Sequence, residues 1–348
     1  MSNLLRYFFI GFLLPVLVQY ICYYQYTTNY TTNAFSKESF TEMYNGSVYK
    51  SRIIGKELHL FAYHQLDKIE KFRNLRNAAD SDLLLTKKRL QFMDPSADPV
   101  FYLTYFLLAT LFTILTVFLL LMSFDQRKFF PQDRRIKDLL ICIFILFLGL
   151  TQFVVTPYDN PGYFFMALGM FLFLKYQSSG RIMYFICLLA VILVATFNRE
   201  TSLLILSFMA AIYFSGERLK FSWIRKMTLP VLCFLIPYLY LKFFHNGGSS
   251  LTEENKLAVN LDITNSYAIR GLAFGAFVLY FLLSVLKRNQ AKPVLYFLLF
   301  SLPYIIIIHA VGVMIEYRLW MPVLLGGLVL SLLNVRAEND SSTVPQGA

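Results

Sequence analysis

The sequence predicts an all-α polytopic integral membrane protein with about ten transmembrane helices and a long, partly helical first extracytoplasmic loop. Three observations support this fold class. Of the 348 residues, 57% are hydrophobic and only 15% are charged. The mean hydropathy is +0.54, which leaves too little polar surface to cover a water-soluble globule. The apolar residues also gather in long runs separated by short polar segments.

The apolar runs define the elements in chain order. They cover residues 4–24, 100–122, 138–156, 162–176, 182–197, 201–215, 227–244, 266–286, 294–311 and 319–335. The first run lacks a small-residue cleavage site and ends in the tyrosine-rich "QYICYYQY", which is typical of an aromatic belt, so we expect a retained span. We treat 1–348 as a single membrane domain, with an extracytoplasmic loop at 25–99 and a cytoplasmic tail at 336–348.

Lysine and arginine in the short loops predict the orientation. Fifteen of them fall on the side that also carries the N-terminus, against five on the other side. The basic segments are "DQRKFFPQDRRIK", "KYQSSGR", "GERLKFSWIRK", "KRNQAK" and the tail at Arg336. Because cytoplasmic loops carry the excess of positive charge, both termini are expected in the cytoplasm. The loop 25–99 then lies outside. The short connections "TPYDNPG", "NRE", "HNGGSSLTEENK" and "IEYR" lie on the same outer side.

The first loop is long enough to be structured. In "GKELHLFAYHQLDKIEKF", apolar residues recur at three- and four-residue steps, which predicts an amphipathic helix. These residues are Leu58, Phe61, Ala62, Leu66, Ile69 and Phe72. This apolar face could contact the outer leaflet or pack on the protein's own helices, and the sequence does not separate the two. A second candidate helix is "SDLLLTKKRLQF".

An arginine and a glutamate interrupt the apolar sequence "VATFNRETSLLIL". The runs beside Arg199 and Glu200 are only about 14 to 16 residues long, or about 21 to 24 Å as helices, against about 30 Å of hydrocarbon. We therefore expect the pair to lie below the membrane surface and to face a partner or a watery cavity. The alternative is that Asn198 is the N-cap of the next helix and that both charges are ordinary hairpin residues.

Two further outward hairpins carry charge. "TPYDNPG" contains Asp159, although its Asp, Asn, Pro and Gly are also what a tight turn needs. "IEYRLW" contains Glu316 and Arg318, which could form an interfacial ion pair instead of a site.

Other classes of site find less support. Four cysteines within apolar runs imply neither disulfides nor a thiolate metal centre. The net charge of +11 is scattered over loops and is not clustered beside stacking aromatics, so no nucleic-acid partner is expected. No phosphate-binding glycine loop is present. No cofactor is certain, and a divalent cation is left open.

The layout resembles the GT-C class of polytopic membrane glycosyltransferases. The closest local echoes are "YKSRIIGKEL", "YDNPGYF", "NRETSLL" and "EYRLWMP", which look like bacterial membrane proteins of surface-polysaccharide pathways. The resemblance implies a polyprenyl-phosphate-linked sugar donor, a glycan or lipid acceptor, surrounding membrane lipids, and a bacterial cytoplasmic membrane. It also implies an acidic base in the first outer loop. The usual acidic pair directly after the first span is absent here, and only Glu38 and Glu42 stand near that place.

Glycosyl transfer from a lipid phosphate needs a carboxylate to accept the proton of the acceptor and cations to stabilise the departing phosphate. We expect Glu42 or Asp159 to be the base. The arginines Arg52, Arg199 and Arg318 are expected to face the phosphate, with Glu200 and Glu316 orienting them.

Two other functions remain open at this point. A polysaccharide polymerase or ligase would use similar arginines on a lipid-linked chain. A flippase or transporter is expected to carry polar groups on both halves of its pathway, whereas the charged hairpins here lie on one side.

Overall fold

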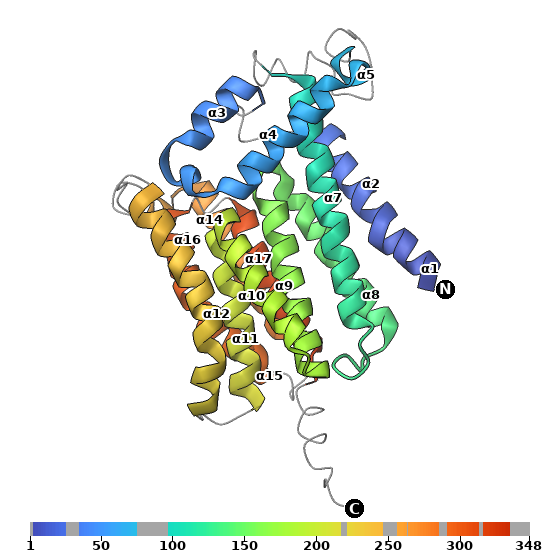
Figure 1. Ribbon diagram of the computed structural model, residues 1–348, viewed down its shortest axis with the longest axis vertical. Coiled ribbons are helices and arrows are strands. Elements are labelled where there is room, and N and C mark those ends of the chain that lie inside the picture. The colour runs from blue at the N-terminus through green and yellow to red at the C-terminus, as the bar shows by residue number, and fades with distance from the viewer. Residues whose placement is uncertain are drawn as a thin grey trace, which may run out of the picture.

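The computed structural model describes residues 3–25, 35–74, 97–216, 221–245, 256–262, 264–284, 291–312 and 316–334. Helices form nearly all of this structure, and no β-strand occurs in these ranges. Long helices stand side by side in a bundle, and the helices of residues 37–73 lie across one end of it (Figure 1). The predicted all-α class is confirmed.

Helical structure occupies each of the ten predicted apolar runs. The first run forms one continuous helical stretch of α1 (Asn3–Arg6), η1 (Tyr7–Leu13), α2 (Leu14–Tyr20) and η2 (Ile21–Gln25). The others contain α7 (Pro99–Phe124), α8 (Arg134–Leu150), α9 (Asp159–Ser179), α10 (Ile182–Asn198), α11 (Leu203–Gly216), α12 (Phe221–Tyr240) with η7 (Leu241–His245), α14 (Ser266–Ser284), α15 (Ala291–Phe300) with α16 (Leu302–Val311), and α17 (Met321–Leu332).

Fewer of these helices can cross a membrane alone. Within the described ranges, three stretches are long and apolar enough: Asn3–Tyr24, Pro99–Phe124 and Ile224–Phe244. Lys292–Phe300 and Leu302–Ala310 meet at 46° and would make a fourth if they formed one broken span. Several other apolar helices are shorter, as the sequence lengths implied. The structure is thus compatible with an integral membrane protein, while the number of ten spans and the orientation stay predictions.

Helix α7 connects the two ends of the bundle. Its 26 residues correspond to about 39 Å at the helical rise. Asp98 caps its first turn by accepting a hydrogen bond from the Val100 amide, and it also accepts one from the hydroxyl of Tyr63 in α4 (Ile53–Lys68). At the opposite end, Asp125 pairs with the buried Arg6.

Helix α17 lies in the core of the bundle. All twelve of its residues are buried, as expected for a helix that is apolar all round. It packs against α8, α9, α11, α14 and α15. The short turn η9 (Tyr317–Leu319), which carries Arg318, directly precedes it. The position of this arginine is therefore set by the most enclosed helix of the structure.

The first-loop region is helical in the part that the structure describes. It contains α3 (Lys37–Asn45), η3 (Ser47–Ser51), α4 and α5 (Glu70–Arg73), which lie across the end of the bundle in blue (Figure 1). The second predicted loop helix, "SDLLLTKKRLQF", lies outside the described residues.

Helix α4 packs on α7 and α10, but its buried face is not the one that the sequence pattern predicts. Gly55 and His59 are buried, whereas Phe61 and Ile69 of the predicted apolar face are exposed. The helix also ends at Lys68 instead of continuing to Phe72. The pattern failed because close backbone approach and ring stacking, not aliphatic spacing, decide which face is covered.

His59 lies among aromatic rings. Its ring centroid is 4.0 Å from that of Tyr105, 4.5 Å from Phe101 and 5.1 Å from Phe40. Neither ring nitrogen has a hydrogen-bond partner among the described residues. Burial lowers the pKa of His59 to about 3, because a charged imidazolium would lose its hydration there.

Candidate functional site

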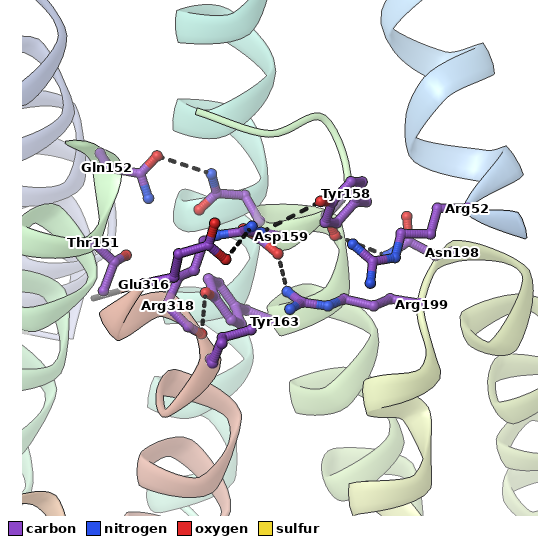
Figure 2. A network of polar contacts seen from close by, with 12 residues as sticks. Arg52, Thr151, Gln152, Tyr158, Asp159, Tyr163, Asn198, Arg199, Glu316 and Arg318 are labelled. Carbon is purple, nitrogen blue, oxygen red and sulfur yellow. Dashed lines mark hydrogen bonds and ion pairs between the residues drawn. The ribbon is translucent and has the colours of Figure 1, made fainter. Parts of the chain in front are cut away.

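Three arginines from distant parts of the chain meet at Tyr158 and Asp159 (Figure 2). Arg52 stands between η3 and α4, Arg199 between α10 and the turn η6 (Glu200–Ser202), and Arg318 in η9. Arg52 and Arg199 lie between helices and Arg318 lies in the short turn before α17, and the three guanidinium groups converge on the start of α9. We call these three arginines the arginine cluster.

Asp159 joins two members of the cluster. One carboxylate oxygen pairs with Arg199 Nη1, and the other accepts a hydrogen bond of 2.6 Å from Arg318 Nη1. All three side chains are buried. Asp159 is the first residue of α9, where the helix dipole favours a negative charge. The segment "TPYDNPG" is thus more than a turn, because it places an ionised carboxylate between two arginines.

Tyr158 provides an aromatic surface for the cluster. The guanidinium carbons of Arg52, Arg199 and Arg318 lie 4.4, 5.4 and 5.8 Å from its ring centroid, within the range of cation–π attraction. The ring of Tyr49 stacks on it at 6.3 Å. The arginines therefore share one electron-rich ring as well as one carboxylate.

Asn198 holds the hairpin of Arg199 against the start of α9. Its side-chain amide donates a hydrogen bond of 2.9 Å to the backbone carbonyl of Tyr158. It is the last residue of α10, and α11 begins only at Leu203. The interpretation of Asn198 as the N-cap of the following helix is therefore wrong. The side chain instead ties two hairpins together.

Arg318 is anchored by both its side chain and its backbone. Nη2 donates to Glu316 at 2.7 Å, and the hydroxyl of Tyr163 in α9 donates to its carbonyl oxygen at 3.1 Å. The hydroxyl of Tyr304 in α16 donates to the next carbonyl, that of Leu319, at 2.7 Å. These bonds hold the guanidinium group in a buried position. An ion pair exposed to water at the membrane interface would not need such anchoring.

Arg52 and Glu200 form the looser side of the cluster. Arg52 Nη2 lies 3.5 Å from a carboxylate oxygen of Glu200, which is the longest ion pair of the group. Glu200 also interacts electrostatically with Arg199 and with Lys242, which lies in η7. Since η7 packs against η3, this side gathers residues from the first loop and from the end of α12.

A chain of buried polar side chains continues from Asp159 into the bundle. Asn160 donates to Gln152 at 3.4 Å and accepts from Thr113 at 3.4 Å. Gln152 in turn accepts from Tyr23 at 3.3 Å, and Gln19 donates to Thr113 at 3.0 Å. Buried amides and hydroxyls are costly unless they are bonded to one another, so this chain fixes the register of α2, α7 and α9 beside the site.

The cluster can bind an anion more readily than a metal ion. Three arginines face three carboxylates, and the oxygens of Asp159 are already engaged. Among the described residues, no group of three His, Cys, Asp or Glu is placed to share a metal ion. The available donors are guanidinium groups, which match the oxygens of a phosphate. Arg52 Nε and Arg318 Nε are buried without a partner in the described structure.

The structure brings together most of the residues expected from the sequence. Six of the seven lie in one network: Arg52, Asp159, Arg199, Glu200, Glu316 and Arg318. Glu42 does not, because its side chain is exposed on α3. Its helix reaches the site through Tyr44, whose ring lies 6.2 Å from that of Tyr158.

Sequence reasoning missed the residues that organise the arginines. Tyr158, Asn198 and Tyr49 act through ring faces and an amide, and such contacts leave no periodic pattern in a sequence. The adjacency of Tyr158 to Asp159 was the one available signal. Comparisons of this chain with protein-family models, with curated proteins and with solved structures find no match.

Proposed function

We propose that this protein is a membrane glycosyltransferase that moves a sugar from a polyprenyl-phosphate-linked donor to a glycan or lipid acceptor. The observation that carries this proposal is the convergence of Arg52, Arg199 and Arg318 on one tyrosine and one aspartate. In such a transfer the bond between the sugar and the phosphate breaks, and negative charge grows on the departing phosphate. Fixed cations near that phosphate stabilise the transition state more than the ground state.

Arginine suits this role because its planar fork can bind two phosphate oxygens at once and never loses its charge. The cluster is also prearranged, because Asp159 and Tyr158 hold the guanidinium groups before any ligand arrives. Little reorganisation is then needed during the reaction, which is how fixed charges contribute most to catalysis.

The surroundings fit a donor with a lipid tail. Helix α12 and η7 expose large apolar side chains, among them Ile236, Tyr240, Phe243 and Phe244. Lys242, on the same segment, contributes positive charge near Glu200. The phosphate of the donor would bind the arginine cluster, and its polyprenyl chain would lie along these neighbouring apolar helices. Following the loop charges, we place the acceptor on the extracytoplasmic face. The choice of a bacterial cytoplasmic membrane follows from the resemblance to proteins of surface-polysaccharide pathways.

A divalent cation has no ready set of ligands in the described cluster. Asp159 binds arginines through both carboxylate oxygens and Glu316 binds Arg318 through one, so a metal ion at either carboxylate would compete with a buried ion pair. We therefore assign no step to a metal ion and give the charge stabilisation to the arginines.

The test is a reconstituted assay. The purified protein is placed in liposomes with radiolabelled polyprenyl-phosphate sugars of the hexose, pentose and amino-sugar types, together with a membrane lipid and glycan extract as acceptor. Loss of label from the donor is followed for the wild type, for Arg199→Ala and for Arg318→Ala. Arg181→Ala, an exposed arginine at the start of α10, is the matched control.

We expect acceptor-dependent release of label in the wild type and in Arg181→Ala. Each cluster variant should lose turnover while its melting temperature in detergent shows a folded protein. Retained turnover in both Arg199→Ala and Arg318→Ala would contradict the proposal. Movement of labelled lipid across the bilayer without consumption of donor would assign the cluster to a transport path, and a product of many sugars would indicate a polymerase or ligase.

A further inference from the structure

The three carboxylates that pair with the arginine cluster differ in their access to solvent. The side chain of Asp159 is 5% exposed, that of Glu316 is 12% exposed and that of Glu200 is 41% exposed. A base that removes a proton from an acceptor hydroxyl must lie within hydrogen-bond reach of that acceptor. Only Glu200, among these three, presents its carboxylate to an arriving acceptor.

The carboxylates also differ in how firmly they are bound. Asp159 uses both oxygens on arginines, and Glu316 binds Arg318 at 2.7 Å. A carboxylate oxygen that already accepts a hydrogen bond from a buried arginine is less available to an acceptor hydroxyl. The contact between Arg52 and Glu200 is longer, at 3.5 Å, and is therefore the pair that a competing anion can separate at least cost.

Arg52 is equipped to accept such a competing anion. Its Nε is a buried donor without a partner in the described structure, and its guanidinium is held 4.4 Å above the ring of Tyr158. Arg318 Nε is likewise buried and unpaired. A phosphate that reached Arg52 would satisfy a donor that Glu200 leaves unused.

We propose that Glu200 is the general base and that the donor phosphate activates it by taking Arg52 away from it. This inference rests on the proposed glycosyl transfer. When the phosphate binds Arg52, Glu200 loses its nearest positive partner and its affinity for a proton rises. The base is thus weak while the site holds no donor and becomes stronger when the sugar is in place.

The chemical step balances without a further reactant. The acceptor oxygen forms a bond to the anomeric carbon of the sugar, and the bond from that carbon to the phosphate oxygen breaks. The electron pair of the broken bond stays on the polyprenyl phosphate, whose charge the arginine cluster stabilises. The proton of the acceptor hydroxyl passes to the carboxylate of Glu200.

The experiment separates donor binding from transfer. It uses the full-length protein in liposomes and a radiolabelled polyprenyl-phosphate sugar that the wild type consumes. Glu200→Gln is expected to bind the donor several-fold more tightly, because the competitor for Arg52 has lost its charge. Its transfer rate should fall by about 100-fold or more, as for loss of a general base. In Glu200→Ala, where the shortened side chain leaves room for a small carboxylate, added formate should restore part of the transfer. Glu57→Gln, an exposed glutamate of α4, is the matched control.

A second comparison tests the coupling to Arg52. In an Arg52→Ala background, Glu200→Gln should no longer tighten donor binding, because the group that the two anions compete for is gone. Unchanged transfer in Glu200→Gln, or an equal loss of binding and transfer without rescue of Glu200→Ala by formate, would overturn the base assignment alone. If the wild type releases no label from any donor, the proposed transfer itself fails and the role of Glu200 falls with it.

Discussion

Asp159 binds Arg199 through one carboxylate oxygen and Arg318 through the other, so a single side chain holds α9, the hairpin after α10 and the turn before α17 together. The two arginines lie 40 and 159 residues away from it in the chain. Because all three groups are buried, neither arginine can exchange its partner for water. Asp159 is therefore a structural requirement of the site, whatever it contributes to the proposed transfer.

Asp159→Asn should be strongly destabilising. The amide keeps the shape of the side chain but removes the buried ion pair of Arg199 and leaves Arg318 with Glu316 as its negative partner. Breaking a buried ion pair from one side typically costs about 3 to 5 kcal/mol. We expect a loss of that size in the free energy of unfolding, measured by SDS titration in mixed micelles. Glu57→Gln, whose side chain is exposed, should change it by less than about 0.5 kcal/mol. A change for Asp159→Asn no larger than this control would contradict the structural role.

Gly55→Ala should separate Arg52 from the rest of the cluster. A Cβ at Gly55 would lie 2.7 Å from the carbonyl oxygen of Pro157 and 2.7 Å from Tyr158 Cα. Both are backbone atoms, so α4 itself must move away from the start of α9. We expect a loss of about 1 to 3 kcal/mol in stability and weaker donor binding.

Gly46→Ala is the matched control for that change. A Cβ at Gly46 meets its nearest atoms at 3.8 and 3.9 Å, which is ordinary contact distance. Donor binding and melting temperature should stay near those of the wild type. Equal effects of the two glycine substitutions would show that the contact between α4 and Tyr158 does not position Arg52.

His59 should make the protein less stable in acid. Its pKa is about 3 in the folded state, against an ordinary value of 6.5. Between these values the unfolded chain binds a proton that the folded protein does not, so stability falls as the pH falls. The expected loss between pH 7 and pH 5 is about 2 kcal/mol. His59→Phe keeps an aromatic ring in the cluster and should remove this part of the pH dependence. Identical slopes in the two proteins would exclude His59 as its source.

The sequence allowed the helical class and most of the site to be predicted, because both depend on residue type. Apolar runs report burial or lipid contact, and helices occupy all ten of them. Charged residues within such runs are costly, so Arg199, Glu200 and Asp159 stood out before their partners were known. The reason is physical: an ion in an apolar setting needs a counter-ion, and the structure supplies one for each.

Hydropathy could not predict which surfaces meet. The aliphatic face of α4 is partly exposed, while Gly55 and His59 form the contact, because a missing side chain and a flat ring pack more closely than branched chains. Tyr158 was overlooked for a similar reason, since its ring face attracts arginines without any charge of its own. The number of membrane spans also depends on helix length. Within the described ranges, only three stretches are long and apolar enough to cross a membrane, or four if the bent pair forms one span.

Arg6 should stabilise the opposite end of the bundle without affecting the proposed transfer. Its buried guanidinium pairs with Asp125 and Asp138 at 2.6 Å each, and the hydroxyl of Tyr7 donates to Asp125 at 2.9 Å. These contacts join the first helical stretch to the end of α7 and to α8. Arg6→Met retains the length of the side chain but removes both ion pairs. We expect the free energy of unfolding to fall by about 1.5 to 3 kcal/mol, as for hydrogen bonds to charged groups.

The decisive comparison for Arg6 is activity per folded molecule. Arg6 lies at the far end of α7 from Asp98, so donor binding and transfer by folded Arg6→Met should match the wild type at a temperature well below its melting point. A lower melting temperature with unchanged kinetics would show that the two ends of α7 act independently. Loss of transfer in a fully folded Arg6→Met protein would instead show that the buried polar chain through Gln19 and Thr113 couples the N-terminal helix to the arginine cluster.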